Sequence, residues 1–337
     1  MLREDTVTII GAGLAGCSLA WDLHFRGHPF VLREDQPERA SSLAAAGMLA
    51  PITGKALNPS WRISEYHEDA LAFYARVESE LETKLWYSYP VVRPFFDAKD
   101  RRKFERKCEA KPAVAHWVDS IEDDLSHVHA DAGALVQKGS GRLYVKKFVQ
   151  ETRAYFGSRG LYQEGPIPLC STPVIYSGGA RSLIEQNPIK LSHRCAKGEI
   201  LTIKAPDLPQ DRILSRGTWI VPTGYEDGTF LAGANYEWDD LTNTPTAAGK
   251  EKVLAGISRL INVPFEVISH VAGVRPIIRQ SEPVIGSLES DQYYMNGLGS
   301  KGVLYAPKVA HTLLNHILLD HPIPQELSLA ELPTTGL

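Results

Sequence analysis

Two short apolar runs and one helical stretch open the chain. Residues 7–10 and 30–33 are runs of mainly apolar or β-branched side chains, a pattern typical of strands buried on both faces. The segment between them predicts a helix that runs to about Arg26 and stops at Gly27, because glycine is favoured just past a helix C-terminus. The opening of the chain therefore predicts a strand–helix–strand unit.

Helical periods and short apolar runs continue along the rest of the chain. A stripe of Leu71, Tyr74, Val77 and Leu81 predicts an amphipathic helix over 64–83, and a charged segment predicts a solvated helix over 98–110. The segment 141–145 leads into a helix ending near Phe156, and further helices are predicted over 246–261 and 303–319. The predicted strands are 85–92, 174–177, 200–203, 218–221, 229–232, 270–274 and 293–295, with turns at 225–228 and 283–286. The strands that follow residue 198 indicate an antiparallel sheet.

Composition favours a two-domain globular protein. The chain has 337 residues, which is long for one hydrophobic core, and its apolar and charged contents are ordinary. A net charge of −4 argues against general attraction to nucleic acid or to anionic membranes, and no apolar run is long enough to span a bilayer. The chain enters a strand directly, which argues against a signal peptide, and its four scattered cysteines suit a reducing cytoplasm without a zinc site.

A glycine motif at the first strand–helix junction predicts a dinucleotide site. Gly11 permits a tight turn, Gly13 lets the backbone approach a diphosphate, and Gly16 lets the helix pack against the strand. Glu34 ends the second strand at a spacing of 34 − 11 = 23 residues, which suits a carboxylate that binds ribose hydroxyls and favours FAD or NAD over NADP. The alternative is a glycine-rich turn that binds nothing. The expected contacts at this end are Gly11, Gly13, Leu14, Ala15, Gly16 and Glu34.

Two further segments are poor in bulky side chains. Residues 41–51 contain mostly alanine, serine and glycine, which predicts a chain lying flat against something large, although an alanine-rich helix is the alternative. Residues 296–302 form a second glycine-rich loop that precedes a helix. The start of a helix presents free N–H groups, so this loop is a second candidate anion site.

These segments together resemble the FAD-dependent D-amino-acid oxidase family. The resemblance rests on the N-terminal glycine motif, on Ala46-Gly-Met-Leu-Ala-Pro51, and on the pair Gly273-Val-Arg-Pro276 and Gly302-Val-Leu-Tyr-Ala-Pro307. Within this family, the chain is similar to glycine and sarcosine oxidases. The loop Gly297-Leu-Gly-Ser-Lys-Gly302 also resembles the FAD domain of the bifunctional enzyme that trims carboxymethylaminomethyl-uridine in tRNA.

The resemblance implies an α/β fold with a Rossmann-type FAD-binding domain and a second, α+β substrate domain that contains a mostly antiparallel sheet. The FAD-binding domain would combine 1–62, 140–196 and 270–322. The substrate domain would combine 63–139 and 197–269, and 323–337 would form a C-terminal tail. The implied reaction removes a hydride from the carbon that bears an amine, passes it to flavin N5, and releases an imine that hydrolyses in water.

The resemblance also assigns candidate catalytic residues. Arg275 would hold a substrate carboxylate with its planar guanidinium, unless it only forms a surface salt bridge. Trp219 and Tyr236 stand where such oxidases place pocket side chains, and each has a core position as its alternative. Lys301, with Ser300 beside it, would add a cation near the flavin N1–C2=O edge or point to solvent. The expected cofactor contacts outside the first turn are Ser42, Ala46, Gly47, Met48, Gly178, Gly297, Gly299, Ser300, Lys301, Gly302 and Val303.

Three departures from the family pattern limit the assignment. Residues 157–173 are short for a segment that carries a β excursion near the adenine in relatives, so the adenine contacts are not placed. Ser300 stands where glycine-oxidase-like proteins often have an arginine. The 296–302 loop has no cysteine of the kind that attaches FAD in some sarcosine oxidases, so we expect non-covalent FAD.

Three functions stay open at the level of sequence. The first is oxidation of the C–N bond of a small amino acid or secondary amine that carries a carboxylate, with O₂ or another electron acceptor. The second is oxidation of a larger amine such as a modified tRNA nucleoside, which the Ser300-Lys301 variant favours and the mild acidity disfavours. The third is a non-catalytic flavin-binding protein. A homo-oligomer is compatible with each, and a plain NAD dehydrogenase would leave the C-terminal glycine loop without a role.

Overall fold

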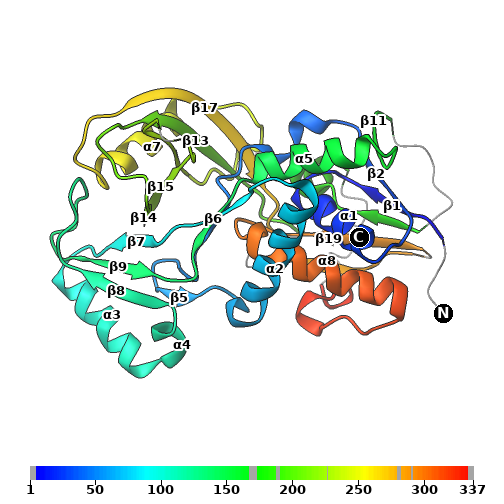
Figure 1. Ribbon diagram of the computed structural model, residues 1–337, viewed down its shortest axis with the longest axis horizontal. Helices are drawn as coiled ribbons and strands as arrows, with labels where there is room; N and C mark the ends of the chain where they lie inside the picture. The colour runs from blue at the N-terminus through cyan, green and yellow to red at the C-terminus, as the bar shows by residue number, and fades with distance from the viewer. Residues whose placement is uncertain are drawn as a thin grey trace.

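The computed structural model describes residues 5–166, 173–186, 190–225, 227–278, 282–289 and 291–332, and Figure 1 shows them as two sheets lying side by side. A six-stranded sheet with its helices lies near both termini, and an eight-stranded sheet forms the other half of the molecule. Among the described residues, no helix combines the length and the apolar character that crossing a membrane would require.

The six-stranded sheet contains the strand–helix–strand unit predicted at the start of the chain. Its order is β11-β2-β1-β12-β19-β18, and all neighbours are parallel except β18 and β19. The strands are β1 Val7–Ile10, β2 Phe30–Glu34, β11 Tyr162–Glu164, β12 Val174–Tyr176, β18 Val284–Ser287 and β19 Gln292–Asn296. The helices α1 Leu14–Phe25, α2 Ile63–Leu81, α5 Val145–Gly157 and α8 Gly302–Leu319 share one hydrophobic core with this sheet.

The eight-stranded sheet has the order β17-β13-β16-β15-β14-β7-β9-β8. Every neighbouring pair is antiparallel except β14 and β7, which agrees with the mostly antiparallel sheet expected from the sequence. Its strands are β7 Val91–Pro94, β8 Val118–Glu122, β9 Ala134–Gln137, β13 Ala196–Lys204, β14 Ile213–Arg216, β15 Thr218–Pro222, β16 Thr229–Gly233 and β17 Glu266–Arg275. Helix α7, Ala247–Ser258, packs into the core on one face of this sheet.

Short elements link the two sheets. A three-stranded sheet combines β3 Met48–Leu49, β10 Gly141–Leu143 and β6 Trp86–Ser88, and a two-stranded sheet combines β4 Ile52–Thr53 and β5 Asn58–Pro59. The remaining helical elements are α3 Ala98–Ala110, α4 Pro112–Ala115, α6 Gly179–Arg181, the 3₁₀ turns η1 Pro37–Arg39, η2 Ser41–Leu43, η4 Gln325–Leu327 and η5 Leu329–Glu331, and the π-helical η3 Ser182–Gln186. The division of the chain into two discontinuous domains stays a prediction.

Two predicted elements were wrong. The strand expected over 85–92 is two strands in different sheets, because Pro90 has no N–H to donate and the chain turns there between β6 and β7. The turn expected over 283–286 is strand β18. Gly286 lies in that strand opposite Tyr294, and a Cβ on it would stand 2.8 Å from the Leu329 Cβ, so this glycine permits close packing rather than a turn.

The alanine-rich segment does not form a long helix. Ser41–Leu43 make one 3₁₀ turn and Met48–Leu49 pair with β10, so the segment lies largely extended, as the first of the two readings predicted. Gly47 has φ +76°, and a Cβ on it would stand 1.9 Å from the Leu143 carbonyl oxygen. This close approach requires glycine and fixes the segment against β10.

Candidate active site

One cavity of about 600 Å³ lies between the carboxyl ends of the parallel strands and one face of the eight-stranded sheet. Ligands of open α/β sheets bind at such strand ends. The predicted site residues that line it are Gly11, Gly13, Leu14, Ala15, Glu34, Ser42, Ala46, Gly47, Met48, Gly178, Trp219, Tyr236, Arg275, Gly299, Ser300, Lys301, Gly302 and Val303. The predicted contacts Gly16 and Gly297 are not among the lining residues. The sequence therefore brings its two glycine loops and its candidate arginine into one space.

The glycines of the first loop have different structural tasks. Gly11 has φ +102°, and a Cβ on Gly16 would stand 1.8 Å from the Gly11 carbonyl oxygen, so both are required by the backbone itself. A Cβ on Gly13 would meet only the Ser42 Oγ, at 3.2 Å. Gly13 thus keeps free a space that belongs to the cavity rather than to the packing of the chain.

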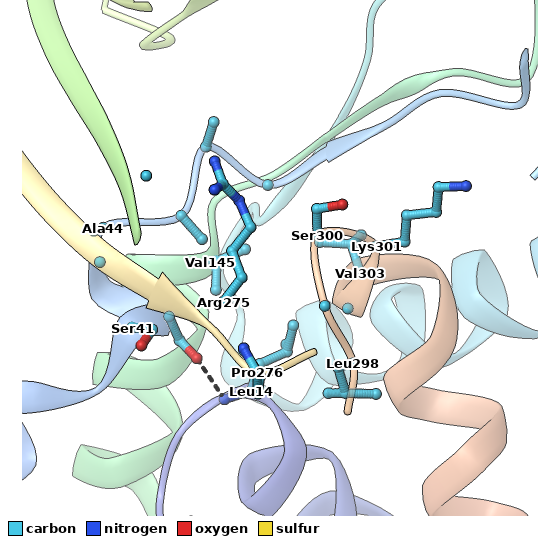
Figure 2. A pocket seen from close by; sticks show the side chains of 18 of the residues that line it. Leu14, Ser41, Ala44, Val145, Arg275, Pro276, Leu298, Ser300, Lys301 and Val303 are labelled. Carbon is cyan, nitrogen blue, oxygen red and sulfur yellow. Dashed lines mark hydrogen bonds between the residues drawn. The ribbon is translucent and has the colours of Figure 1, made fainter. Parts of the chain in front are cut away.

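The first turn of α1 is prepared for an anion. Its N-cap residue, Gly13, has no side chain to cap the helix, and the Leu14 N–H donates to Ser42 Oγ at 2.9 Å (Figure 2, dashed line). A hydroxyl that binds a helix N–H can also bind a phosphate oxygen. Because the glycine turn, the helix start and this hydroxyl meet at one point, the residues present fit the diphosphate of a dinucleotide.

Glu34 is buried and organises the glycine loop. Its Oε2 accepts from the Ala12 N–H at 2.9 Å, and its Oε1 accepts from the Gln36 N–H at 3.2 Å and lies 3.5 Å from Arg181 Nη2. Arg153, which the sequence analysis missed, donates to the Ala12 carbonyl oxygen at 2.8 and 3.0 Å. The Ala12 peptide is therefore held from both sides, and the carboxylate stands in the cavity wall.

We expect Glu34→Gln to weaken FAD binding by roughly 10- to 150-fold, since a lost hydrogen bond to a charged group costs about 1.5–3 kcal/mol. An amide also replaces one acceptor with an NH₂ group that faces backbone donors, which loosens the loop. Titration of the apoprotein with FAD measures the change. Glu38→Gln is the matched control, because Glu38 is exposed and lies outside the cavity. Equal affinities in both variants would exclude Glu34 as a ribose ligand.

The second glycine loop faces the same cavity. Gly297 and Gly299 have φ +79° and +56°, and the Gly299 N–H donates to the Pro276 carbonyl oxygen at 2.9 Å. The Lys301 N–H donates to Leu298 at 3.3 Å. These two donors of the loop are thus engaged within the chain. Burial lowers the pKa of the Lys301 ammonium, which forms no ion pair within the described residues, and Figure 2 shows its side chain pointing away from Arg275.

Arg275 is a half-buried cation without a carboxylate partner among the described residues. It ends β17, and Figure 2 shows its side chain projecting between the Ala44 segment and Ser300. Its Nη1 donates to the carbonyl oxygens of Lys197 and Asn235 at 3.4 and 3.3 Å, and its Cζ lies 4.2 Å from the centre of the Tyr236 ring. Burial lowers the pKa of this guanidinium, which is a sign that the charge lacks compensation.

The two candidate pocket aromatics both line the cavity. Trp219 lies on β15 opposite Gly233, and a Cβ on that glycine would stand 3.0 Å from the Trp219 ring. Tyr236 is 48% exposed and stacks on Trp238, with ring centres 5.7 Å apart. Trp219 is half-buried and also packs against a hydrophobic cluster that includes Val91 and Ile213, whereas Tyr236 is exposed. The pocket role of both side chains stays a prediction.

Two buried arginines were missed by the sequence analysis. Arg142 donates through Nε to the Ala46 carbonyl oxygen at 2.9 Å and also binds the Pro222 carbonyl oxygen, so it holds the extended segment beside the cavity. Arg93 lines the cavity itself and is 9% exposed. Both stand in short strands whose pairing is set by distant residues, and the local sequence carries no signal of their burial.

The rest of the lining bears on the chemistry of the site. Among the described residues, the lining contains no histidine or cysteine, and no group of three or more His, Cys, Asp or Glu side chains is placed to hold a metal ion. Cys170 and part of the short 157–173 segment lie outside the described residues, so the adenine contacts remain unplaced. Gly178 is the N-cap residue of the short helix α6 and lines the cavity, as Glu34 does.

The chain matches the family model of FAD dependent oxidoreductases, DAO, over residues 6–315. The chain belongs to this family. FAD is accordingly its cofactor, and the enzyme is an oxidoreductase of the class that the sequence resemblance indicated. The glycine turn, the free space at Gly13 and the Glu34 carboxylate are the features of this chain that fit that cofactor.

Individual relatives are distant. The tRNA 5-methylaminomethyl-2-thiouridine biosynthesis bifunctional protein MnmC of Marinobacter nauticus is 23% identical over 353 residues, which cover 93% of this chain and 55% of that protein. The chain thus spans about half the length of this relative. Glycine oxidase from Geobacillus kaustophilus has the same fold, with a TM-score of 0.78, 18% identity, and coverage of 99% of this chain and 100% of that one. Iminodiacetate oxidase from Chelativorans sp. BNC1 follows, with a TM-score of 0.77, 19% identity, and coverage of 94% and 96%.

Proposed function

We propose that this enzyme oxidises the C–N bond of an amino acid or secondary amine that carries a carboxylate. The observation that carries the proposal is Arg275, a half-buried guanidinium that faces the cavity, lacks a carboxylate partner among the described residues, and stands opposite the second glycine loop. Burying a charge without a partner is costly, so such a group is retained where a ligand supplies the opposite charge. The names of similar proteins, glycine oxidase and iminodiacetate oxidase, agree with this substrate class.

In the proposed complex, residues of the first loop hold the diphosphate and ribose. Gly13 and Ser42 offer backbone approach and a hydroxyl to the diphosphate at the start of α1, while Glu34 accepts from ribose hydroxyls. Gly47 and Met48 lie along the extended segment where a flat ring system fits. Ser300 and Gly302 keep N–H groups for the negative charge that builds on a reduced ring, and FAD supplies the two-electron acceptor. Because the described lining contains no cysteine, we expect the cofactor to be held non-covalently.

The substrate carboxylate would lie against Arg275. Hydrogen bonds from the guanidinium to the backbone carbonyl oxygens of Lys197 and Asn235 hold it in position, and the Tyr236 ring covers one of its faces. A planar guanidinium bound to both carboxylate oxygens fixes the direction of the substrate as well as its position. That direction decides which C–H bond is presented to the ring.

A larger amine is the second candidate. It is favoured by the extent of the cavity, whose lining continues from Arg275 to Trp219, Ser215 and Phe96, beyond the space that a glycine would fill. The name of the Marinobacter relative, a tRNA modification protein, points to the same candidate. Turnover of a free amino acid against turnover of a modified nucleoside separates the two. A purely structural flavoprotein would have no need for an arginine without a carboxylate partner at this position.

The rate constant for reduction should rise with pH as the bound substrate amine loses its proton. Hydride loss needs the nitrogen lone pair, which an ammonium lacks, and the described lining contains no histidine, while Glu34 stands at the opposite end. We expect the substrate to lose this proton before hydride transfer, to solvent or to the neutral amine of Lys301, whose pKa burial lowers. Anaerobic stopped-flow measurement of flavin bleaching over a range of pH tests this. A flat profile for a substrate that binds as the ammonium would refute it.

A further inference from the structure

Arg93 is a second cation that lines the same cavity. It is 9% exposed, lines the cavity, and forms neither an ion pair nor a hydrogen bond through its side chain within the described residues. Burial lowers the pKa of its guanidinium, with Asp100 and Arg216 as the charged groups that act on it. Asp100 is bound elsewhere, because its Oδ2 accepts from the Phe96 N–H at 3.2 Å. Arg93 therefore resembles Arg275 in having no carboxylate partner, and it is the more deeply buried of the two.

The register of the eight-stranded sheet places the two arginines on one face. Arg275 pairs with Ala196 on β13, Ile200 with Gly233, and Gly233 with Trp219 on β15. Directly paired residues share a face, and so do residues two positions apart in one strand. The same face continues through Ser215, which pairs with Trp219, to Arg93, because Ile213 pairs with Val91. Arg275, Ile200, Trp219, Ser215 and Arg93, which share this face of the sheet, all line the same cavity.

The two arginines lie at opposite ends of that face. The Arg275 guanidinium reaches over β13, since a Cβ on Gly198 would stand 2.2 Å from its Nη2. From β13 the sheet order passes β16, β15 and β14 to reach β7. At about 4.8 Å per strand spacing, this is a path of about 19 Å along the sheet, shortened by the reach of Arg93 into the cavity. A single small amino acid cannot bind both guanidinium groups.

We infer that Arg93 forms a second anion subsite, which takes a carboxylate or phosphate at the far end of the substituent on the substrate amine. This inference rests on the proposed function, because Arg275 must hold the first carboxylate. The substrate class is then an elongated N-substituted amino acid with two anionic ends. The exposed ring of Phe96, with the Arg216 guanidinium 4.0 Å from its centre, stands beside the Arg93 end and gives an apolar surface for the substituent.

Binding of substrate-like ethers to the holoenzyme tests the inference. In alkoxyacetic acids an oxygen replaces the amine nitrogen, so they bind without turnover, and their ω-carboxy and ω-phosphono derivatives add the second anion. Dissociation constants are measured by calorimetry over a series of chain lengths. Once the chain is long enough for its two anions to reach Arg275 and Arg93 together, the doubly anionic compound should bind about tenfold or more tightly than the singly anionic compound of equal length. The carboxy and phosphono arms identify the preferred anion.

Variants assign that preference to Arg93. Arg93→Gln should bring the ratio of the two dissociation constants close to one, while Arg102→Gln, an exposed arginine on α3, should keep the wild-type ratio. Arg93→Met should also raise the melting temperature of the ligand-free protein, because it removes an uncompensated buried charge, whereas a structural arginine would lower it. Absence of a preference in the wild type, or equal loss in both glutamine variants, overturns the inference.

The same measurements distinguish failure of the proposed function from failure of the Arg93 subsite. If the singly anionic acids bind equally well to wild type and Arg275→Gln, Arg275 is not the carboxylate ligand and the function itself is wrong. If they bind through Arg275 but the second anion brings no gain, only the Arg93 subsite is refuted.

Discussion

Replacing Arg275 with alanine should lower kcat/KM for a carboxylate-bearing amine by about 30- to 4,000-fold. Truncating one member of a buried charged pair typically costs about 2–5 kcal/mol, and each factor of ten corresponds to roughly 1.4 kcal/mol. The loss is large because the substrate carboxylate would then enter a cavity whose nearest described cation is gone. Steady-state kinetics on an amine that the wild type accepts measure the effect.

The lysine variant separates charge from geometry. Arg275→Lys keeps a positive charge but loses the planar fork and the stacking on Tyr236, so it should also fail substantially. FAD content should stay near that of the wild type in both variants, because Arg275 stands at the substrate end of the cavity. An amine without a carboxylate should lose little in either variant.

A different outcome would change the substrate class. If the wild type prefers uncharged amines and Arg275→Ala alters neither the preference nor the rate, Arg275 is structural. The larger-amine candidate would then come first. Thermal unfolding of the variant then shows a lower melting temperature, because the hydrogen bonds to Lys197 and Asn235 and the contact with the Tyr236 ring are lost.

Local chemistry explains what the sequence could predict. The glycine turn, the helix after it and Glu34 follow from spacing within one strand–helix–strand unit, and the structure places them as expected. The different structural roles of Gly13 and Gly16 could be predicted only in part from the sequence. Gly16 was expected to permit packing, but the structure adds that the obstacle is the carbonyl oxygen of Gly11 itself.

Long-range pairing explains what the sequence could not predict. Arg93 follows two valines in a short strand, and its neighbours on the cavity face come from β14 and β15, more than 100 residues later in the chain. Arg142 likewise binds the distant carbonyl oxygens of Ala46 and Pro222. From the local sequence alone, an arginine in a short apolar run would be predicted to be an exposed residue at a sheet edge. Only the register of the assembled sheets turns these two inward.

Substitution of Gly13 by valine should abolish or strongly weaken FAD binding while leaving the fold intact. The Gly13 backbone has φ −81° and ψ −165°, which any residue adopts, and a Cβ there meets only the Ser42 hydroxyl. The side chain would instead fill the space into which a diphosphate fits. Forcing extra methyl groups into a filled site costs about 1–3 kcal/mol or more, which corresponds to a loss of roughly 5- to 150-fold or greater in affinity.

The measurement is FAD content after purification, followed by titration of the apoprotein and by thermal unfolding without FAD. Wild-type protein should be yellow and should release its flavin on acid treatment. Gly157→Ala is the matched control, because a Cβ there meets only the Tyr162 ring at 3.8 Å and lies away from the cavity. Gly16→Ala should lower stability itself, through its clash with Gly11. If Gly13→Val keeps full FAD affinity with an unchanged melting temperature, the diphosphate does not pass over this turn, and the first glycine loop serves only the packing of α1 on β1.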